Sequence, residues 1–324
     1  MTTSKPYFIL FAHNQVVEGE KRAAIYDLKQ ARVFYIPKVL VGILEELREQ
    51  PLDKIVETYA ADQPKALLQY IDFLQDYDLG FYVDDPQKFP QLPLFYYYPG
   101  TIQNAIVLSD LKSYDLGTAL RELPAQGCRF LNLFIDLQDD LDFERLWQAL
   151  GQVAQSILVS IQLVIRGAEA LPSASLKALY LQHKKLSQIT ICESNANRVD
   201  SEIPIHYSEG SLEEFLAPTS DQLILNIPFF SEAIRFNPYY YQKVVISWKG
   251  EIKNGINTQK EFGWIQDDSL GEIVTSVDFQ QLWEVNADQI TELQNSELRY
   301  AKFINQALEI GREEQFQIRK PVLS

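Results

Sequence analysis

Apolar side chains near the start of the chain fall in short runs separated by polar or glycine-containing turns. Short apolar runs bounded in this way are typical of β-strands. The sequence therefore predicts a small antiparallel ribbon, with turns at Asn14, near Gly19 and at Asp27–Lys29. The predicted strands are Tyr7–Ala12, Ala23–Tyr26 and Val33–Ile36.

After this ribbon the apolar spacing changes to three and four residues, which places the apolar side chains on one face of a helix. Pro37, Pro51 and Pro64 stand where a first helical turn tolerates proline. Asp62 is placed to cap the third helix, and Gly80 to follow its end. Together with a closing strand, the elements predict a winged helix-turn-helix. The apolar stripes and the closing strand are Leu40, Ile43, Leu44 and Leu47; Leu52, Ile55, Val56 and Tyr59; Leu67, Tyr70, Ile71 and Leu74; and Leu79–Val83.

The middle of the chain alternates between buried strands and helices. Pro86–Pro99 predicts a linker, although its LPLFYYYP sequence is too aromatic for a loose one. Successive strand–helix units imply a parallel sheet, which could curl into a partial barrel. The predicted strands are Ala105–Leu108, Phe130–Ile135, Ile157–Ile165, Gln188–Ile191, Ile203–Tyr207 and Leu223–Ile227, and the helices between them span 116–123, 143–153 and 176–186.

The last third contains a predicted hairpin, with strand Lys243–Trp248, turn Lys249–Gly250 and strand Glu251–Ile252. The whole pattern therefore predicts an α/β protein. The predicted domains span residues 1–90, 100–230 and 231–324.

Composition changes the picture by exclusion. The 324 residues include 29 basic and 44 acidic side chains, a net charge of −15 that argues against nucleic acid and anionic membranes as partners. No apolar stretch approaches the roughly 20 residues of a membrane span, and the start is no signal peptide. Two cysteines and three histidines allow neither a disulfide framework nor a Cys/His zinc site. We expect a soluble cytoplasmic protein.

Few residues suggest chemistry on the predicted barrel. The chain has no phosphate-binding glycine loop and no G-x-S-x-G elbow. An acidic run follows the second strand of the predicted sheet, where it could hold a hard cation, but acids also stabilise the start of a helix, and we favour that interpretation. Cys128 and Cys192 are expected to be core thiols. The acidic run is Asp136, Asp139, Asp140, Asp142 and Glu144.

The third predicted helix decides between two uses of a winged helix. It carries Lys65 against Asp72 and Asp76, with Asp78 just beyond, so its charge opposes binding to a DNA duplex. The alternative is peptide capture, in which an extended segment adds a strand to the edge of the ribbon.

The run AAIYDLKQARVFYIPKVLVGILEEL, with PLDKIVETYA and ALLQYIDFLQDYDLGFYV after it, resembles the PqqD-like peptide recognition element of enzymes that modify ribosomally made peptides. The resemblance implies that a precursor's leader pairs with the last ribbon strand, beside the third helix. A core role for Phe34, Ile36 and Tyr70 is the alternative. The implied contacts are Val33, Phe34, Tyr35, Ile36, Gln69, Tyr70 and Phe73.

The C-terminal third resembles the SPASM region of radical S-adenosylmethionine peptide maturases, especially those of grasp-with-spasm systems. The family pattern is G-x4-C followed by C-x2-C-E-x-R-x-x-C-x3-C. Here Gly250, Glu297 and Arg299 match, as does Phe279–Trp283, and the two charged residues are expected to form a local ion pair or cap in a turn. Ser109–Tyr114 also lacks the C-x3-C-x2-C motif. The cysteine positions hold Gly255, Leu293, Ser296, Lys302 and Gln306, none of which ligates iron through sulfur.

The resemblance implies a relative of these maturases that has lost its iron–sulfur clusters and carries no cofactor. It would bind the leader of a precursor peptide and present the peptide to a partner ATP-grasp ligase. One alternative is a non-redox peptide-modifying enzyme, with Asp136, Asp139 and Glu144 as candidates for metal binding or acid–base chemistry. A transcription regulator is the other, and the acidic third helix disfavours it.

Overall fold

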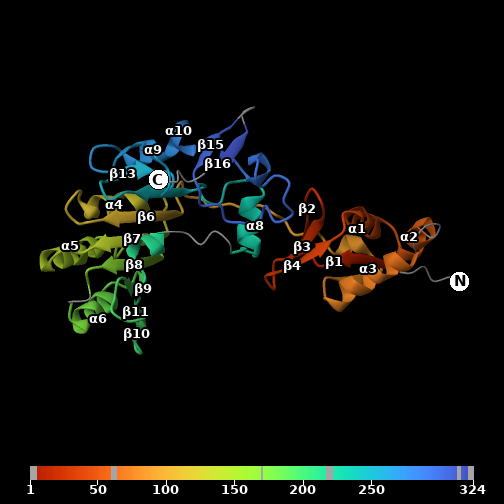
Figure 1. The fold of residues 1–324 in the computed structure, drawn as a ribbon, viewed down its shortest axis with the longest axis horizontal. Coiled ribbons are helices and arrows are strands. Elements are labelled where there is room, and N and C mark those ends of the chain that lie inside the picture. Colours follow the sequence, from red (N-terminus) through yellow and green to blue (C-terminus); the bar gives the residue numbers. More distant parts are fainter. Residues whose placement is uncertain (1–5, 60–63, 169–170, 217–221, 312–314, 320–324) are drawn as a thin grey trace.

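A computed structural model describes residues 6–59, 64–168, 171–216, 222–311 and 315–319. Figure 1 shows an elongated molecule, with α1–α3 and β1–β4 at one end, the large sheet at the other and α8 between them. The sheet is mostly parallel, and the chain is an α/β protein. No helix in the described ranges is both long and apolar enough to cross a membrane.

The N-terminal strands form two small antiparallel sheets. One has the order β2-β3-β4, and the other pairs β1 with β5. The ribbon prediction was therefore wrong in one respect: Tyr7–Ala12 lies outside it, and its place is taken by a strand that begins at Asn14. Asn14 is no turn residue, because its buried side chain donates a 2.7 Å hydrogen bond to the carbonyl of Leu79. The strands are β1 (Tyr7–Leu10), β2 (Asn14–Glu18), β3 (Ala23–Asp27), β4 (Arg32–Ile36) and β5 (Gly80–Val83).

Three helices pack on this pair of sheets, as the apolar stripes predict: α1 (Val39–Glu49), α2 (Leu52–Tyr59) and α3 (Pro64–Asp76). The predicted cap Asp62 lies outside the described residues. Gly80 lies beyond the end of α3, as predicted, and begins β5, whereas the left-handed position at the helix end is taken by Asp78, which has a φ of 55°. With Asp78 in this left-handed conformation, the amide of Leu79 reaches back 2.8 Å to the carbonyl of Leu74, as in a Schellman motif.

The large sheet contains nine strands in the order β10-β11-β9-β8-β7-β6-β12-β13-β14. Six adjacent strands of this sheet are parallel to one another, namely β11, β9, β8, β7, β6 and β12. The strands are β6 (Asn104–Ser109), β7 (Phe130–Asp136), β8 (Ser160–Arg166), β9 (Leu186–Ile191), β10 (Arg198–Val199), β11 (Ile205–Tyr207), β12 (Lys243–Ile246), β13 (Glu251–Lys253) and β14 (Gly263–Trp264).

One predicted strand of this sheet does not form. Leu223 makes only an isolated bridge to Lys302, and Ile227 begins α8 (Ile227–Ala233), whose N-terminus is capped by Asn226. The place beside β6 is taken by β12 of the predicted C-terminal hairpin. β8 also begins later than predicted, since Ile157 is exposed and Lys185 binds the carbonyls that precede the strand.

The two faces of the sheet are covered differently. Helices α4 (Leu116–Ala125), α5 (Asp140–Gly151) and α6 (Ser173–Gln182) pack on one face, where they bury the main core. On the other face, α7 (Leu212–Leu216) covers the carboxyl-terminal half of the strands at Leu108, Phe134 and Val164. The amino-terminal half of this second face is not covered by a described helix.

The remaining elements are short. The segment after the hairpin packs around an apolar cluster that includes Val285, Ile290 and Leu293. The predicted linker is packed, because the hydroxyl of Tyr96 donates to Gln103 and that of Tyr98 to the carbonyl of Gly127. These elements are η1 (Pro86–Lys88), α9 (Leu270–Thr275), α10 (Val277–Gln280), η2 (Ala287–Gln289), β15 (Leu308–Ile310) and β16 (Phe316–Ile318).

Candidate functional site

The outer edge of β4 is the first candidate site. β4 pairs with β3 on one side, and no strand of the described chain pairs with its other side. Along such an edge every second residue directs its N–H and C=O groups outward, which offers hydrogen bonds to a further strand. The backbone geometry needed for strand addition is therefore present at β4.

An aromatic cluster stands beside this edge, formed by Phe34 of β4, Phe73 of α3 and Tyr77 in the turn that follows α3. The ring of Phe34 lies 6.3 Å from that of Phe73 and 5.1 Å from that of Tyr77, centroid to centroid. Phe73 and Tyr77 are 4.9 Å apart and follow each other by one helical turn. Tyr77 was not predicted as a contact residue, although its position four residues after Phe73, just past the end of α3, could have revealed it.

The other predicted contact residues divide between exposed and packed positions. Tyr35 is 47% exposed, and the guanidinium of Arg22 lies 3.6 Å from its ring centroid. Gln69 is exposed on α3. Ile36 is buried in the N-terminal core, with Tyr70 packed against that core. Val33 packs on the opposite face of the ribbon, against a cluster that includes Phe230 of α8.

That opposite face attaches the ribbon to the C-terminal third. Nε of Arg22 lies 2.6 Å from Oε1 of Glu297, and the hydroxyl of Tyr26 donates a 2.7 Å hydrogen bond to the carbonyl of Glu297. Arg299 donates to Asp288 at 2.7 Å and also binds the carbonyl of Glu18. Arg299 thus forms the expected local ion pair, with Asp288, whereas Glu297 pairs with Arg22 of the ribbon.

The residues at the family's cluster positions do not fit an iron–sulfur cluster. None carries sulfur, and a Cβ added at Gly255 would lie 2.8 Å from Cε1 of Tyr239. Leu293 is buried in the apolar cluster of the C-terminal segment. Both cysteines are buried elsewhere, where burial raises the pKa of Cys128 to about 12 and that of Cys192 to about 11.

The acidic run from the end of β7 into α5 serves structural roles. Asp136 binds Arg166 through both carboxylate oxygens, at 3.0 and 2.7 Å. Asp139 caps α5 by accepting from the amide of Asp142, and the buried Asp142 carboxylate accepts from Arg145 at 3.0 Å. Over the described ranges, no three histidine, cysteine or acidic side chains gather as a metal site would require.

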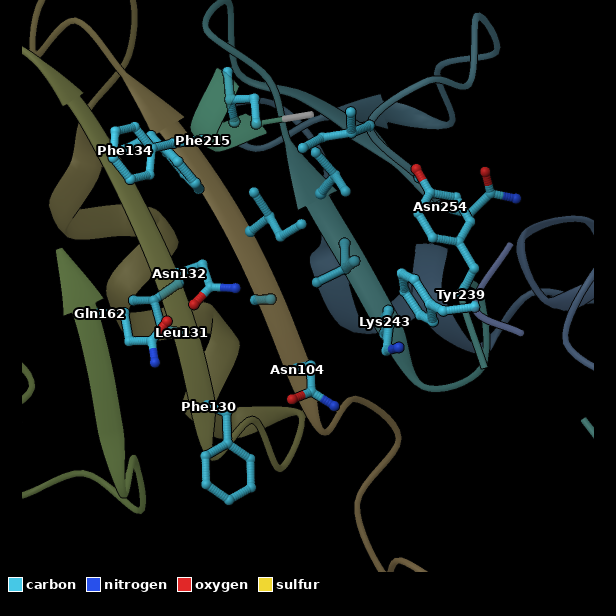
Figure 2. Close-up of a pocket in the computed structure, with 18 of the residues that line it drawn as sticks. Asn104, Phe130, Leu131, Asn132, Phe134, Gln162, Phe215, Tyr239, Lys243 and Asn254 are labelled. Carbon is cyan, nitrogen blue, oxygen red and sulfur yellow. The ribbon is translucent and has the colours of Figure 1, made fainter. Parts of the chain in front are cut away.

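A pocket of about 520 Å³ lies over the uncovered half of the large sheet (Figure 2). Figure 2 shows Asn104, Asn132 and Gln162 on three adjacent strands, with Lys243 on β12 beyond them. The strand register supports this arrangement, since Asn104 is the Cα partner of Lys243 and Asn132 that of Gln162. Its polar lining is completed by Ser160, Tyr239 and Asn254.

Lys243 is the charged residue of this lining. Its ammonium binds the carbonyl of Pro238 and lies 5.1 Å from the ring centroid of Phe303. Burial lowers the pKa of the Lys243 amine, and the charge of Glu232 offsets this only in part. Burial likewise raises the pKa of Glu232 to about 7, against the opposing effect of Lys243. Perturbed groups beside a pocket are typical of functional sites. Neither residue belongs to a sequence motif, so neither could be singled out from the sequence alone.

Comparison with known proteins adds little to this geometry. No protein-family model matches the sequence, and no curated protein matches it. Among solved structures, SuiB of Streptococcus suis bound to S-adenosylmethionine is similar at a TM-score of 0.28 and 9% identity, covering 91% of this chain and 94% of that one. Similarity at this level assigns neither a family nor a function.

Proposed function

We propose that this protein binds an extended peptide along the outer edge of β4 and acts in the maturation of a ribosomally made peptide. The observation that carries the proposal is the open edge of β4 beside the cluster formed by Phe34, Phe73 and Tyr77. Strand addition draws affinity from main-chain hydrogen bonds and specificity from side-chain pockets next to the edge. The open edge would supply the main-chain hydrogen bonds, and the aromatic cluster would supply the side-chain contacts.

The position of this edge suits presentation of the peptide to another protein. The ribbon is tied to the C-terminal third through the Arg22–Glu297 pair and the cluster around Phe230, so a bound peptide would be held at a fixed place on the chain. By resemblance, the partner that then modifies the peptide is an ATP-grasp ligase. The charge of α3, with Asp72 and Asp76 exposed, favours a peptide over a DNA duplex.

The experiment is calorimetric titration of the full chain with a precursor peptide encoded beside its gene. We expect binding at micromolar concentration, and a leader whose alternate backbone amides are N-methylated should lose affinity with a period of two residues. This period follows because only every second residue of an added strand bonds to the edge. Absence of binding at high micromolar peptide, or a methylation profile without that period, would refute the proposal.

Side-chain variants locate the edge. Phe73→Ala and Tyr77→Ala should each weaken leader binding about tenfold, in the range typical of aromatic contact residues at the centre of an interface. Tyr82→Ala is the matched control, since Tyr82 is a partly exposed tyrosine of β5, in the other small sheet. A larger loss with Tyr82→Ala than with Tyr77→Ala would place the peptide on β5 instead.

A further inference from the structure

The uncovered half of the large sheet is unusual for its type. Sheets of parallel strands are normally buried on both faces. Here the helices α4–α6 cover one face, α7 covers the carboxyl-terminal half of the other, and Asn132 and Gln162 stand exposed on the two central strands β7 and β8. This half of the face is therefore open to a ligand, and the pocket lies over it.

The lining indicates the chemistry of that ligand. The lining of the pocket offers the single cation of Lys243 and no carboxylate, since Glu232, whose charge acts on Lys243, is not among the lining residues. Asn104 is the Cα partner of Lys243 on the adjacent strand, so an amide stands next to the cation. An anionic group fits this position by charge complementarity.

Amide side chains supply the rest of the polar lining. Asn and Gln can each donate and accept, which matches the alternating N–H and C=O groups of a peptide. Asn254 is 3% exposed, and its side-chain oxygen has no hydrogen-bond partner among the described residues. The volume of about 520 Å³ lies within the range of ligand sites in proteins.

We infer that this pocket is a second binding site, which takes a peptide segment bearing a carboxylate, with the carboxylate on Lys243 and the peptide groups on Asn104, Asn132 and Gln162. The inference deepens the proposed function, because a peptide held at β4 by its leader leaves its remaining residues free to reach another site. Burial lowers the pKa of the Lys243 amine, and a carboxylate bound beside it would favour the charged form again, at a place where water screens the attraction less.

The probes are two capped pentapeptides, acetyl-Gly-Ala-Glu-Ala-Gly-amide and its glutamine counterpart, neither of which carries a leader. Binding is followed by NMR of the full chain with ¹³C-dimethylated lysines. We expect the glutamate peptide to shift the Lys243 resonance and to bind at least about tenfold more tightly than the glutamine peptide. Equal affinities, or no shift up to 10 mM peptide (about the weakest binding that such a titration resolves), would overturn the inference.

Two variants test the role of the cation. Lys243→Met should abolish the preference for glutamate, whereas Lys249→Met, an exposed lysine of the same hairpin, should keep it. Asn104→Asp is the second variant, because it places a carboxylate of nearly identical shape beside Lys243 and should block the glutamate peptide without disturbing the fold. Retention of the preference in either pocket variant would count against the inference.

Leader titration separates this result from the proposed function. Pocket variants that lose the pentapeptide while binding the leader normally would support the second site and leave the β4 edge intact. If the leader does not bind but the pentapeptide does, the proposed function fails and the carboxylate site stands.

Discussion

Glu297 lies 275 positions after Arg22 in the sequence, yet Nε of Arg22 donates a 2.6 Å hydrogen bond to its carboxylate. The same residue accepts a hydrogen bond from the hydroxyl of Tyr26 through its carbonyl. These contacts join the N-terminal ribbon to the C-terminal third. Glu297 therefore has a structural role. In the family pattern that the sequence resembles, this glutamate lies between cysteines that bind a cluster.

The Arg22–Glu297 ion pair should help to hold the ribbon in place. Arg22→Ala should lower the free energy of unfolding by about 1 kcal/mol, the range of a partly exposed ion pair, and should speed amide exchange in β2 and β3. Chemical denaturation and hydrogen exchange measure both effects. Lys260→Ala removes the more exposed pair with Asp278 and serves as control, with no change expected in β2 or β3. Unchanged exchange in the ribbon of the Arg22 variant would show that the ion pair does not hold it.

The same ion pair should depend on pH. Burial raises the pKa of the Glu297 carboxyl, but the hydrogen bond from Arg22 and a backbone amide outweigh it and hold the pKa below its usual value. The stabilisation is therefore present above the ordinary glutamate value of 4.5 and is lost as the pH falls through the lower folded value. The stability difference between wild type and Glu297→Gln should shrink below pH 4.5. A difference that stays constant down to pH 3 would contradict this.

Glu232 should show the opposite dependence. Burial raises its pKa to about 7, so the folded state holds a proton that the unfolded state releases near pH 4.5. The stability of the protein then falls between pH 4.5 and 7 on account of this residue. Glu232→Gln should stabilise the chain more at pH 8 than at pH 4, by up to about 3 kcal/mol for a pKa displaced this far. Urea denaturation at both pH values measures it, with the exposed Glu144→Gln as control.

Two glycines of the N-terminal unit should respond oppositely to alanine. A Cβ at Gly80 would lie 2.6 Å from the carbonyl oxygen of Ile9 and 2.7 Å from the Phe8 ring, so Gly80→Ala should destabilise by roughly 1–3 kcal/mol. Gly42 is exposed within α1 and has no atom within 4 Å of that position, so Gly42→Ala should stabilise by about 0.5–1 kcal/mol. Thermal unfolding of both variants tests the close approach of β5 to β1, which equal effects would disprove.

The two cysteines should be inert in the folded protein. Cys128 and Cys192 are buried, and burial raises the pKa of both thiols, which leaves little of the nucleophilic thiolate at neutral pH. A thiol-specific reagent such as Ellman's should react with them only in denaturant. Rapid labelling of either cysteine at pH 7.5 without denaturant would mean that the core around it opens.

The helices follow closely from the local sequence. The stripe of Leu40, Ile43 and Leu47 recurs in the buried face of α1, because a helix is built from contacts three and four residues apart. The open edge of β4 could also be predicted, since the apolar pattern makes Val33–Ile36 the last strand of the ribbon. The pairing partners of the strands could not be predicted in this way. The pattern of Tyr7–Leu10 suits any half-buried strand, and only its packing beside Gly80 pairs it with β5.

The sequence by itself determined the α/β alternation, the α1–α3 helices and the lack of cysteines at the cluster positions, because each depends on residue type or on neighbours along the chain. Only the tertiary structure decided that β12 inserts beside β6 and that Lys243 therefore stands next to Asn104 over the open half of the sheet. Strand pairing is set by contacts between distant segments, and the same apolar pattern is compatible with several partners. The side of the pocket that carries Lys243 is a consequence of that pairing.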